Sequence, residues 1–523
     1  MLNIYSLYIY LIFCVVVKND AARILGYFPT PSISHQVVFQ TLMLELAKRG
    51  HDVTVITTDP ISPKTKFHSN LTEVDLHDLS YSIWREAVYS DETTTGKKSD
   101  IINQVRVLYN LVTDISEQQI NSKQVQRIIQ SKKEKFDLIF IESLWRPGLG
   151  LAYIFNAPII LISSLLPIYN NMEAMGSPVH PILYPMSFRQ KLNNLTIWDK
   201  IIELYNHYSF IYMFDTAEKK QNEMMKRVFG SDIPPLSELY NNIDMLFLNA
   251  HPFWDSNRPV PPNVVYLGGL HRKPVKELPQ ELQFYLDSSK HGVIYMSYGT
   301  NVSPSQLPPE KIQMIVNVFS RLPYDVIWKW DKDELPGRSK NIKISKWLPQ
   351  SDLLRHPKVL LFITQGGLQS TDEAITAGVP LIGMPMLGDQ WYNVEQYVRH
   401  GIGVRLDLED LTEEKFYNAI NTTINDKSYR QNVERLRTVM SDQPQSALER
   451  AVWWTEYVLR HKGAKHLRSP AANISWGEFL EIELVTYLLL GLTSVIFAIV
   501  IFMYYVVLFI KRYYNANKKQ KSN

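Results

Sequence analysis

The sequence predicts an α/β fold with two doubly wound parallel-sheet domains, followed by one membrane-spanning helix. Short apolar runs alternate with helical patterns between residues 23 and 163, and the same alternation restarts near residue 293. This alternation favours parallel sheets covered by helices on both faces. A third observation is the stretch 484–510, which contains no charged residue. A chain of 523 residues is also long enough for more than one domain.

The first domain is predicted to begin with a strand at 23–28, which is followed by a proline-containing turn and a helical pattern that ends at Gly50. Further strands are expected at 52–57, 138–141 and 157–162 because each run is apolar and short. In a doubly wound sheet, ligands bind at the carboxyl ends of the strands. The residues that follow these strands are therefore the first candidates for a site.

The second half repeats this pattern, with a proline-rich passage and a linker near 271–281 between the two halves. Apolar runs predict strands at 293–296, 326–330, 343–344, 359–363 and 380–385. The predicted organisation is a signal peptide at 1–22, domains at 23–270 and 271–465, a transmembrane helix at 484–510 and a basic tail at 511–523.

Both ends of the chain indicate a secretory-pathway membrane protein. The apolar run 4–17, followed by small residues, is typical of a signal peptide, although a buried strand or helix is an alternative. The segment 484–510 reaches about 40 Å as a helix and could cross a bilayer. Acidic residues precede it and basic residues follow, which predicts a lumenal body and a cytosolic tail. Residues 519–523 fit a dilysine retrieval signal of the endoplasmic reticulum or a plain membrane-flanking basic tail.

The composition bears on nucleic acid binding, disulfides and glycosylation. The formal net charge is only +3, and the body of the chain has no basic stripe, so no nucleic acid partner is expected. The single cysteine, Cys14, lies in the predicted signal peptide, so the mature protein would lack disulfides. Glycosylation sequons start at Asn70, Asn194, Asn301, Asn421 and Asn473.

A glycine pair after a predicted strand carries the strongest chemical signal. The strand 359–363 leads to Gly366 and Gly367 and then to a predicted helix start. Glycines let backbone N–H groups approach a diphosphate, and the helix dipole favours its negative charge. Asp389 and Gln390 follow the next strand, and a carboxylate–amide pair suits sugar hydroxyls, which donate and accept hydrogen bonds.

The stretch from Phe362 through Glu373 to Gln390 resembles the signature of family 1 UDP-glycosyltransferases, and Trp347–Gln350 and 261–271 resemble the same family. The resemblance implies a GT-B-like fold of two Rossmann-like domains that face a cleft, and a membrane-anchored enzyme of the invertebrate type. It also implies a UDP-sugar co-substrate. The donor-binding residues it implies are Ser297, Gly299, Thr300, Trp347, Gln350, Gln365, Gly366, Gly367, Gln369, Ser370, Glu373, Asp389 and Gln390.

The resemblance assigns a part of the donor to each of these groups. Trp347 would stack on uracil with Gln350 near the base and ribose, and Glu373 would bind the ribose. The phosphates would lie at Ser297–Thr300 and at Gln369–Ser370, and the transferred sugar at Asp389 and Gln390. The family often has histidine where this chain has Gln365, and glutamine cannot carry positive charge.

His35 is the candidate general base, because it lies at the start of the first predicted helix, shortly after the first strand. A helix N-terminus biases histidine towards the neutral form that a base needs. In the family, a histidine here pairs with an acidic residue at the end of a later strand, and Glu142 stands at that place, where relatives commonly have aspartate. The implied reaction is one displacement that inverts the anomeric configuration and transfers a hexose, with glucose favoured over glucuronate by the resemblance.

No metal or other cofactor is expected. Asp331 and Asp333 have the carboxylate spacing of some cation sites, but they lie between a strand and the Glu334–Gly337 segment, which favours a solvated turn over a metal site. No His/Cys cluster has ligand spacing.

The acceptor is expected to be small and lipophilic. Aromatic and methionine residues in 59–135 and 163–245 suit an apolar pocket or ordinary core packing. Clearance of foreign compounds and a biosynthetic transfer to a lipid or sterol both stay open, as does a homo-oligomer. A further alternative is a non-catalytic binding or partner protein that keeps the fold, because Glu142 and Gln365 depart from the family pattern.

Overall fold

The computed structural model describes residues 21–61, 69–88, 96–131 and 135–520. The chain divides into two units, Met1–Ser469 and Pro470–Asn523. The first unit contains two parallel β-sheets with their helices, and the second contains the apolar C-terminal helix. The predicted signal peptide, apart from Ala21 and Ala22, lies outside the described residues.

The first sheet has seven parallel strands in the order β3-β2-β1-β4-β5-β6-β7. Strand β1 pairs with β2 on one side and with β4 on the other, so the winding of the chain reverses between β1 and β4. Such a switch point opens a crevice at the carboxyl ends of the two strands. The strands are β1 Arg23–Phe28, β2 Asp52–Thr57, β3 Leu71–Asp75, β4 Leu138–Glu142, β5 Ile159–Ser163, β6 Ile243–Leu248 and β7 Val264–Tyr266.

The second sheet has six parallel strands in the order β10-β9-β8-β11-β12-β13, and its switch point lies between β8 and β11. The predicted diphosphate loops follow these two strands. The strands are β8 Val293–Ser297, β9 Asp325–Lys329, β10 Ile342–Ser345, β11 Val359–Thr364, β12 Leu381–Gly383 and β13 Gly403–Arg405. The two doubly wound sheets confirm the predicted fold class.

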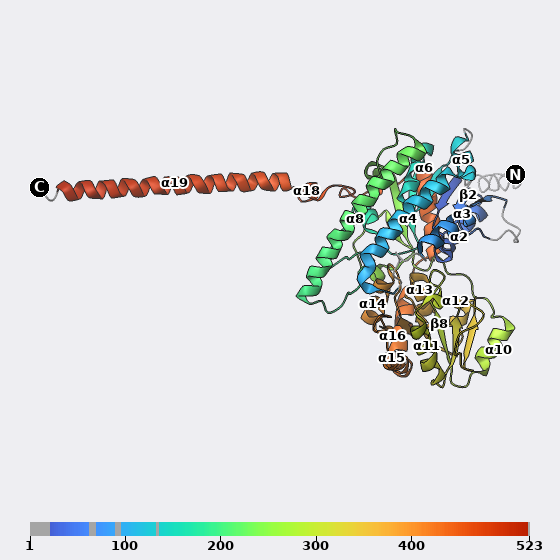
Figure 1. The fold of residues 1–523 in the computed structure, drawn as a ribbon. Coiled ribbons are helices and arrows are strands. Elements are labelled where there is room, and N and C mark those ends of the chain that lie inside the picture. The colour runs from blue at the N-terminus through green and yellow to red at the C-terminus, as the bar shows by residue number, and fades with distance from the viewer. Residues whose placement is uncertain (1–20, 62–68, 89–95, 132–134, 521–523) are drawn as a thin grey trace, which may run out of the picture. The chain divides into compact units, whose positions relative to one another are not determined.

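Helices cover both sheets, as Figure 1 shows. Helices of the first sheet include α4 and α8, which pack against each other, and α8 alone is 33 residues long. The helices that accompany the first sheet are α2 Ile33–Lys48, α3 His77–Val88, α4 Ile101–Asn121, α5 Lys123–Gln130, α6 Leu149–Phe155, α7 Tyr169–Met175, α8 Ile197–Phe229 and α9 Leu236–Leu239. Those of the second half are α10 Gln280–Ser288, α11 Pro309–Ser320, α12 Gln350–Leu354, α13 Leu368–Ala377, α14 Gln390–His400, α15 Glu413–Asn425 and α16 Lys427–Ser441.

Helix α17, Ala447–His461, returns to the first sheet. A Ser446–Glu449 capping box starts it, and its buried residues Ala451, Val452 and Val458 join the core formed by α2 and the first sheet. The predicted second domain, 271–465, included this helix, whereas the structure packs it on the first. Its amphipathic pattern predicts a buried face but does not say which sheet covers that face.

The second unit contains the short helix α18, Trp476–Phe479, and helix α19, Ile482–Gln520. Helix α19 is the one helix within the described part of the chain that is long and apolar enough to cross a membrane. It includes the predicted span 484–510 and most of the predicted tail.

Candidate active site

Helix α2 places His35 at the switch point of the first sheet. The turn after β1 brings Ser32 to the N-cap with extended backbone, φ −155° and ψ 117°, and the helix begins at Ile33. His35 is therefore in the first turn, where its backbone N–H donates to the Ser32 carbonyl at 3.0 Å. Its side chain is 12% exposed, so the ring is accessible from the crevice.

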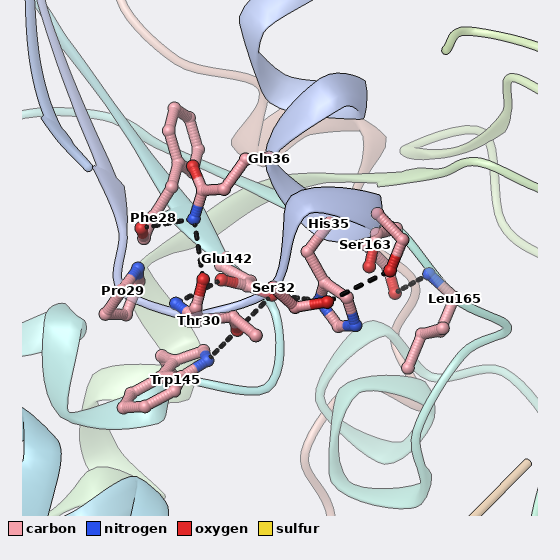
Figure 2. Close-up of polar contacts among 12 residues, drawn as sticks. Phe28, Pro29, Thr30, Ser32, His35, Gln36, Glu142, Trp145, Ser163 and Leu165 are labelled. Atoms are coloured by element: carbon pink, nitrogen blue, oxygen red, sulfur yellow. Dashed lines mark hydrogen bonds and ion pairs between the residues drawn. The ribbon is translucent and has the colours of Figure 1, made fainter. Parts of the chain in front are cut away.

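Glu142 ends β4 and holds the ring of His35. Figure 2 shows the pair: His35 Nδ1 lies 2.7 Å from Glu142 Oε1, and the glutamate side chain is only 2% exposed. The Thr30 hydroxyl contacts the same oxygen at 2.6 Å, and the Thr30 backbone N–H donates to Oε2 at 3.2 Å. The predicted pair is therefore in contact, and a buried threonine supports it.

The hydrogen-bond pattern selects the tautomer of His35. Trp145 Nε1–H, which can only donate, points to the Thr30 hydroxyl oxygen. That hydroxyl must then give its own proton to Glu142, which leaves the glutamate an acceptor for the Nδ1–H of His35. In the neutral ring, Nε2 consequently keeps its lone pair, as a general base requires.

The glycine loops meet at the second switch point. Gly299, in the loop after β8, has φ +71°, and a Cβ there would lie 2.7 Å from Gln365 Nε2. Gly366 has φ +92°, and a Cβ there would lie 2.5 Å from Val394. Both positions therefore favour glycine for their backbone conformation, and Gly366 also for space, because the Gln390 carbonyl lies 3.1 Å from the same Cβ position. The Lys329 amine donates to the Gly299 carbonyl, which ties β9 to the first loop.

Helix α13 begins directly after these glycines, and Gly367 at its N-cap provides no side-chain cap. Free N–H groups at a helix start favour an anion. Gln369, predicted to lie at the phosphates, donates its side-chain amide to the Ser164 carbonyl of the first half at 2.8 Å. Its position thus joins the two halves beside the predicted diphosphate site.

Gln350 connects the residues predicted to hold the nucleoside. Its Nε2 donates to Ser370 Oγ at 2.9 Å and to Glu373 Oε2 at 2.8 Å, while its Oε1 accepts from the Tyr295 hydroxyl at 3.0 Å. Burial raises the pKa of Glu373 to about 7, although the Gln350 hydrogen bond acts in the opposite direction. The Trp347 ring is 61% exposed, with the Lys329 amine 5.6 Å from its centroid.

Asp389 and Gln390 open helix α14 with different partners. Gln390 Oε1 accepts from the backbone N–H groups of Met386 and Leu387, each at 2.9 Å, and so shapes the loop before the helix. Burial raises the pKa of Asp389 to about 6, while the Asn393 hydrogen bond and the charge of His35 lower it.

The chain is similar to known sugar-transferring enzymes over nearly its whole length. The family model described as UDP-glucoronosyl and UDP-glucosyl transferase matches residues 26–520. The chain belongs to the UDP-glycosyltransferase family. An ecdysteroid UDP-glucosyltransferase of Spodoptera littoralis nuclear polyhedrosis virus is 36% identical over 92% of this chain and 96% of the viral protein. UDP-glucosyltransferase 2 of Dactylopius coccus is 32% identical over 99% of both chains.

A solved structure shares the fold of this UDP-glycosyltransferase. The crystal structure of UDP-glucose: anthocyanidin 3-O-glucosyltransferase in complex with UDP superposes with a TM-score of 0.57 at 17% identity. The match covers 85% of this chain and 100% of that one. The fold is therefore GT-B, and membership of the family makes the chain an enzyme that moves a sugar from a UDP-sugar to an acceptor.

The structure also places the two carboxylates considered for a metal in this UDP-glycosyltransferase. Asp331 accepts hydrogen bonds from the backbone and hydroxyl of Ser305, and Asp333 pairs with Lys346 at 2.7 Å. Both carboxylates therefore have partners within the protein. Within the described ranges, no group of three or more His, Cys, Asp or Glu side chains is arranged to hold a metal ion.

Several residues of the UDP-glycosyltransferase site were not predicted. Thr30 and Trp145 support the His35–Glu142 pair, Lys329 holds the first glycine loop, and Asn393 contacts Asp389. The only sequence signal for Thr30 is its place at the end of β1, where doubly wound folds bind ligands. Nothing in the sequence marks the other three, because their partners lie on distant segments.

The partly buried carboxylate of Asp389 should lower stability. Because the pKa of Asp389 is raised, its ionised form costs free energy that is absent below the unfolded pKa, grows as pH rises, and is fully present above about pH 6. Asp389→Asn should therefore raise the thermal unfolding midpoint of the purified protein at pH 7.5, and this gain should shrink as pH falls through 6 towards 4. An equal gain at every pH would contradict the raised pKa. The exposed Asp442→Asn is the matched control.

Proposed function

We propose that this enzyme transfers glucose from UDP-glucose to a hydroxyl group of a small lipophilic acceptor, with inversion and with His35 as the general base. The observation that carries the proposal is the contact of His35 Nδ1 with the buried Glu142 at 2.7 Å, at the switch point of the first sheet. A binding protein would have little use for both a supported base and a set of donor residues. This favours catalysis over the non-catalytic alternative.

The reaction is a single displacement. His35 Nε2 accepts the proton of the acceptor hydroxyl as its oxygen attacks the anomeric carbon. The bond between that carbon and the diphosphate breaks, and UDP leaves with the bonding electron pair. The buried Glu142 stabilises the imidazolium that forms, because its carboxylate already accepts the Nδ1–H. Attack opposite the leaving group inverts the configuration.

The leaving diphosphate is stabilised by backbone dipoles in this proposal. The N-terminus of α13 and the loops at Gly299 and Gly366 supply N–H groups where negative charge develops. Gln365 lies between these loops and can donate a hydrogen bond without adding positive charge. We propose that these groups serve without a divalent metal or another cofactor.

Glucose as the donor sugar is supported by the names of relatives that match nearly the whole chain, which describe UDP-glucosyltransferases. The acceptor proposal rests on the ecdysteroid relatives, whose acceptor is a polycyclic, hydroxylated and largely apolar molecule. Within this chain, Tyr169, Met172 and Met175 are buried in the core, so these aromatic and methionine residues serve packing. Hydroxylated steroids are thus the first acceptors to offer.

We also propose that the protein is a single-pass protein of the endoplasmic reticulum membrane with a lumenal body. Helix α19 supplies the span, and the acidic residues before it and basic residues after it support this orientation. Sequons on exposed surface would then receive glycans. Asn194 and Asn421 are exposed, whereas Asn301 is half-buried and accepts a hydrogen bond from Ser32 beside the crevice.

Removing the base should abolish transfer without affecting nucleotide binding. Full-length His35→Ala should lose about 100-fold to 10,000-fold in UDP release with UDP-glucose and a hydroxylated steroid, because general base catalysis contributes that much. Its affinity for UDP should be unchanged, since His35 is on α2 of the first half and the residues expected to hold the nucleoside are on the second half. The exposed His291→Ala is the control and should match the wild type. Equal release by wild type and His35→Ala would remove His35 from the mechanism, and UDP binding without turnover by the wild type would favour a binding protein.

Glycan mapping tests the orientation and the crevice together. In secretory cells, Asn194→Gln and Asn421→Gln should each shift the protein to a lower mass on a denaturing gel, and glycosidase treatment should remove the difference. Asn301→Gln should leave the mass unchanged because its side chain bonds to Ser32. A protein with no glycan at any site would contradict the lumenal orientation, and a glycan at Asn301 would contradict the crevice geometry.

A further inference from the structure

Asn393 lies at the centre of the contact between the two halves of the enzyme. It is fully buried on α14, four residues after Asp389. Its side-chain Nδ2 donates to the Asp389 carboxylate at 2.9 Å and to the Gly366 carbonyl at 3.0 Å. One amide group therefore contacts both the predicted sugar-binding carboxylate and the predicted diphosphate loop.

The remaining atom of that amide reaches into the first half of the chain. Asn393 Oδ1 accepts a hydrogen bond from the indole N–H of Trp254 at 3.1 Å. Trp254 lies in the 3-10 helix η4, Pro252–Asp255, which follows β6 of the first sheet. The amide thus joins three segments, and both of its hydrogens and its oxygen are used.

Trp254 is held from both sides. Its carbonyl accepts from the Tyr392 hydroxyl and from Gln396 Nε2, each at 3.0 Å, and its ring stacks on His400 at 5.7 Å. The neighbouring Asp255 forms a two-pronged ion pair with Arg258 and accepts from the Tyr266 hydroxyl of β7 at 2.8 Å. Trp254 is therefore fixed to the first sheet, and its indole packs against α14.

The indole N–H fixes which way the Asn393 amide points. An indole can donate but cannot accept, so the amide oxygen must face Trp254. The amide nitrogen then faces Asp389 and Gly366, which are both acceptors. A reversed amide would set its oxygen against a carboxylate and a carbonyl, and would set two donors against each other at Trp254.

We propose that Trp254 and Asn393 are positioning residues that hold the Asp389 carboxylate in place for the transferred sugar, so that sugar recognition depends on contact between the two halves. The inference rests on the proposed function, because it takes Asp389 as the sugar-binding carboxylate. Uridine and ribose are expected at Trp347, Gln350 and Glu373, all on the second half. Binding of UDP alone should therefore not need the Trp254 contact.

Trp254→Phe tests this because it keeps an aromatic ring beside His400 and removes the N–H together with the five-membered ring of the indole. The measurement is the affinity of the full-length protein for UDP and for UDP-glucose by calorimetry without acceptor. We expect Trp254→Phe to weaken UDP-glucose about 10-fold, the effect of about one net hydrogen bond, and to change UDP less than 2-fold. Trp453→Phe, at a half-exposed tryptophan on α17, is the matched control and should change neither affinity.

A double-mutant cycle separates positioning from general loosening. If the indole acts through the amide, Trp254→Phe should add nothing further to the loss of UDP-glucose affinity in Asn393→Ala. Three results would each overturn the inference. Trp254→Phe could weaken the binding of UDP and of UDP-glucose equally, or it could bind both with wild-type affinity. The losses of UDP-glucose affinity in the two single variants could also add in the double variant. The affinities are measured without turnover, so they test the positioning role separately from catalysis. A wild type that binds both ligands but transfers no sugar would contradict the proposed function and leave the positioning role intact.

Discussion

The 2.7 Å contact between His35 Nδ1 and Glu142 determines which ring nitrogen can accept a proton. The proposed reaction depends on that nitrogen. A histidine ring has two nitrogens, and only a defined partner for one leaves the other free to accept a proton. Here Trp145 and Thr30 fix the direction of the hydrogen bonds around Glu142, so the free lone pair belongs to Nε2. The supporting residues come from the ends of β1 and β4, at the switch point of the first sheet.

The second sheet also has a switch point, but the residues around it suit a diphosphate instead of a proton transfer. Its switch point brings together two glycine loops and an uncapped helix start, which suit a diphosphate, and places two raised-pKa carboxylates nearby. Partial burial of Asp389 and Glu373 costs stability, which is common where polar groups are arranged for a ligand. In the proposed mechanism, the first sheet supplies the proton acceptor and the second supplies the donor site, and contacts such as Trp254–Asn393 hold the two together.

Much of this arrangement could be predicted from the sequence, because the strands of a doubly wound sheet are apolar and the residues after them are marked by position. Strands β1 and β2 lie where the apolar pattern placed them. Strand β6 was missed because Asp244 interrupts its apolar run, and the structure shows why a carboxylate is tolerated there: it accepts from the backbone N–H groups of Ile159 and Ala464. The partnership of Asn393 with Trp254 spans 139 residues of chain, a contact that no local pattern encodes.

The most direct test of His35 as the base is its dependence on acceptor acidity. Transfer rates of wild type and His35→Ala would be compared across a series of phenols of similar shape and graded pKa. An acidic phenol is already ionised and needs no base, so the account predicts that the rate ratio of wild type to variant shrinks steadily as the phenol becomes more acidic. A large ratio that stays constant across the series would contradict proton transfer to His35 and would assign this residue a purely structural role.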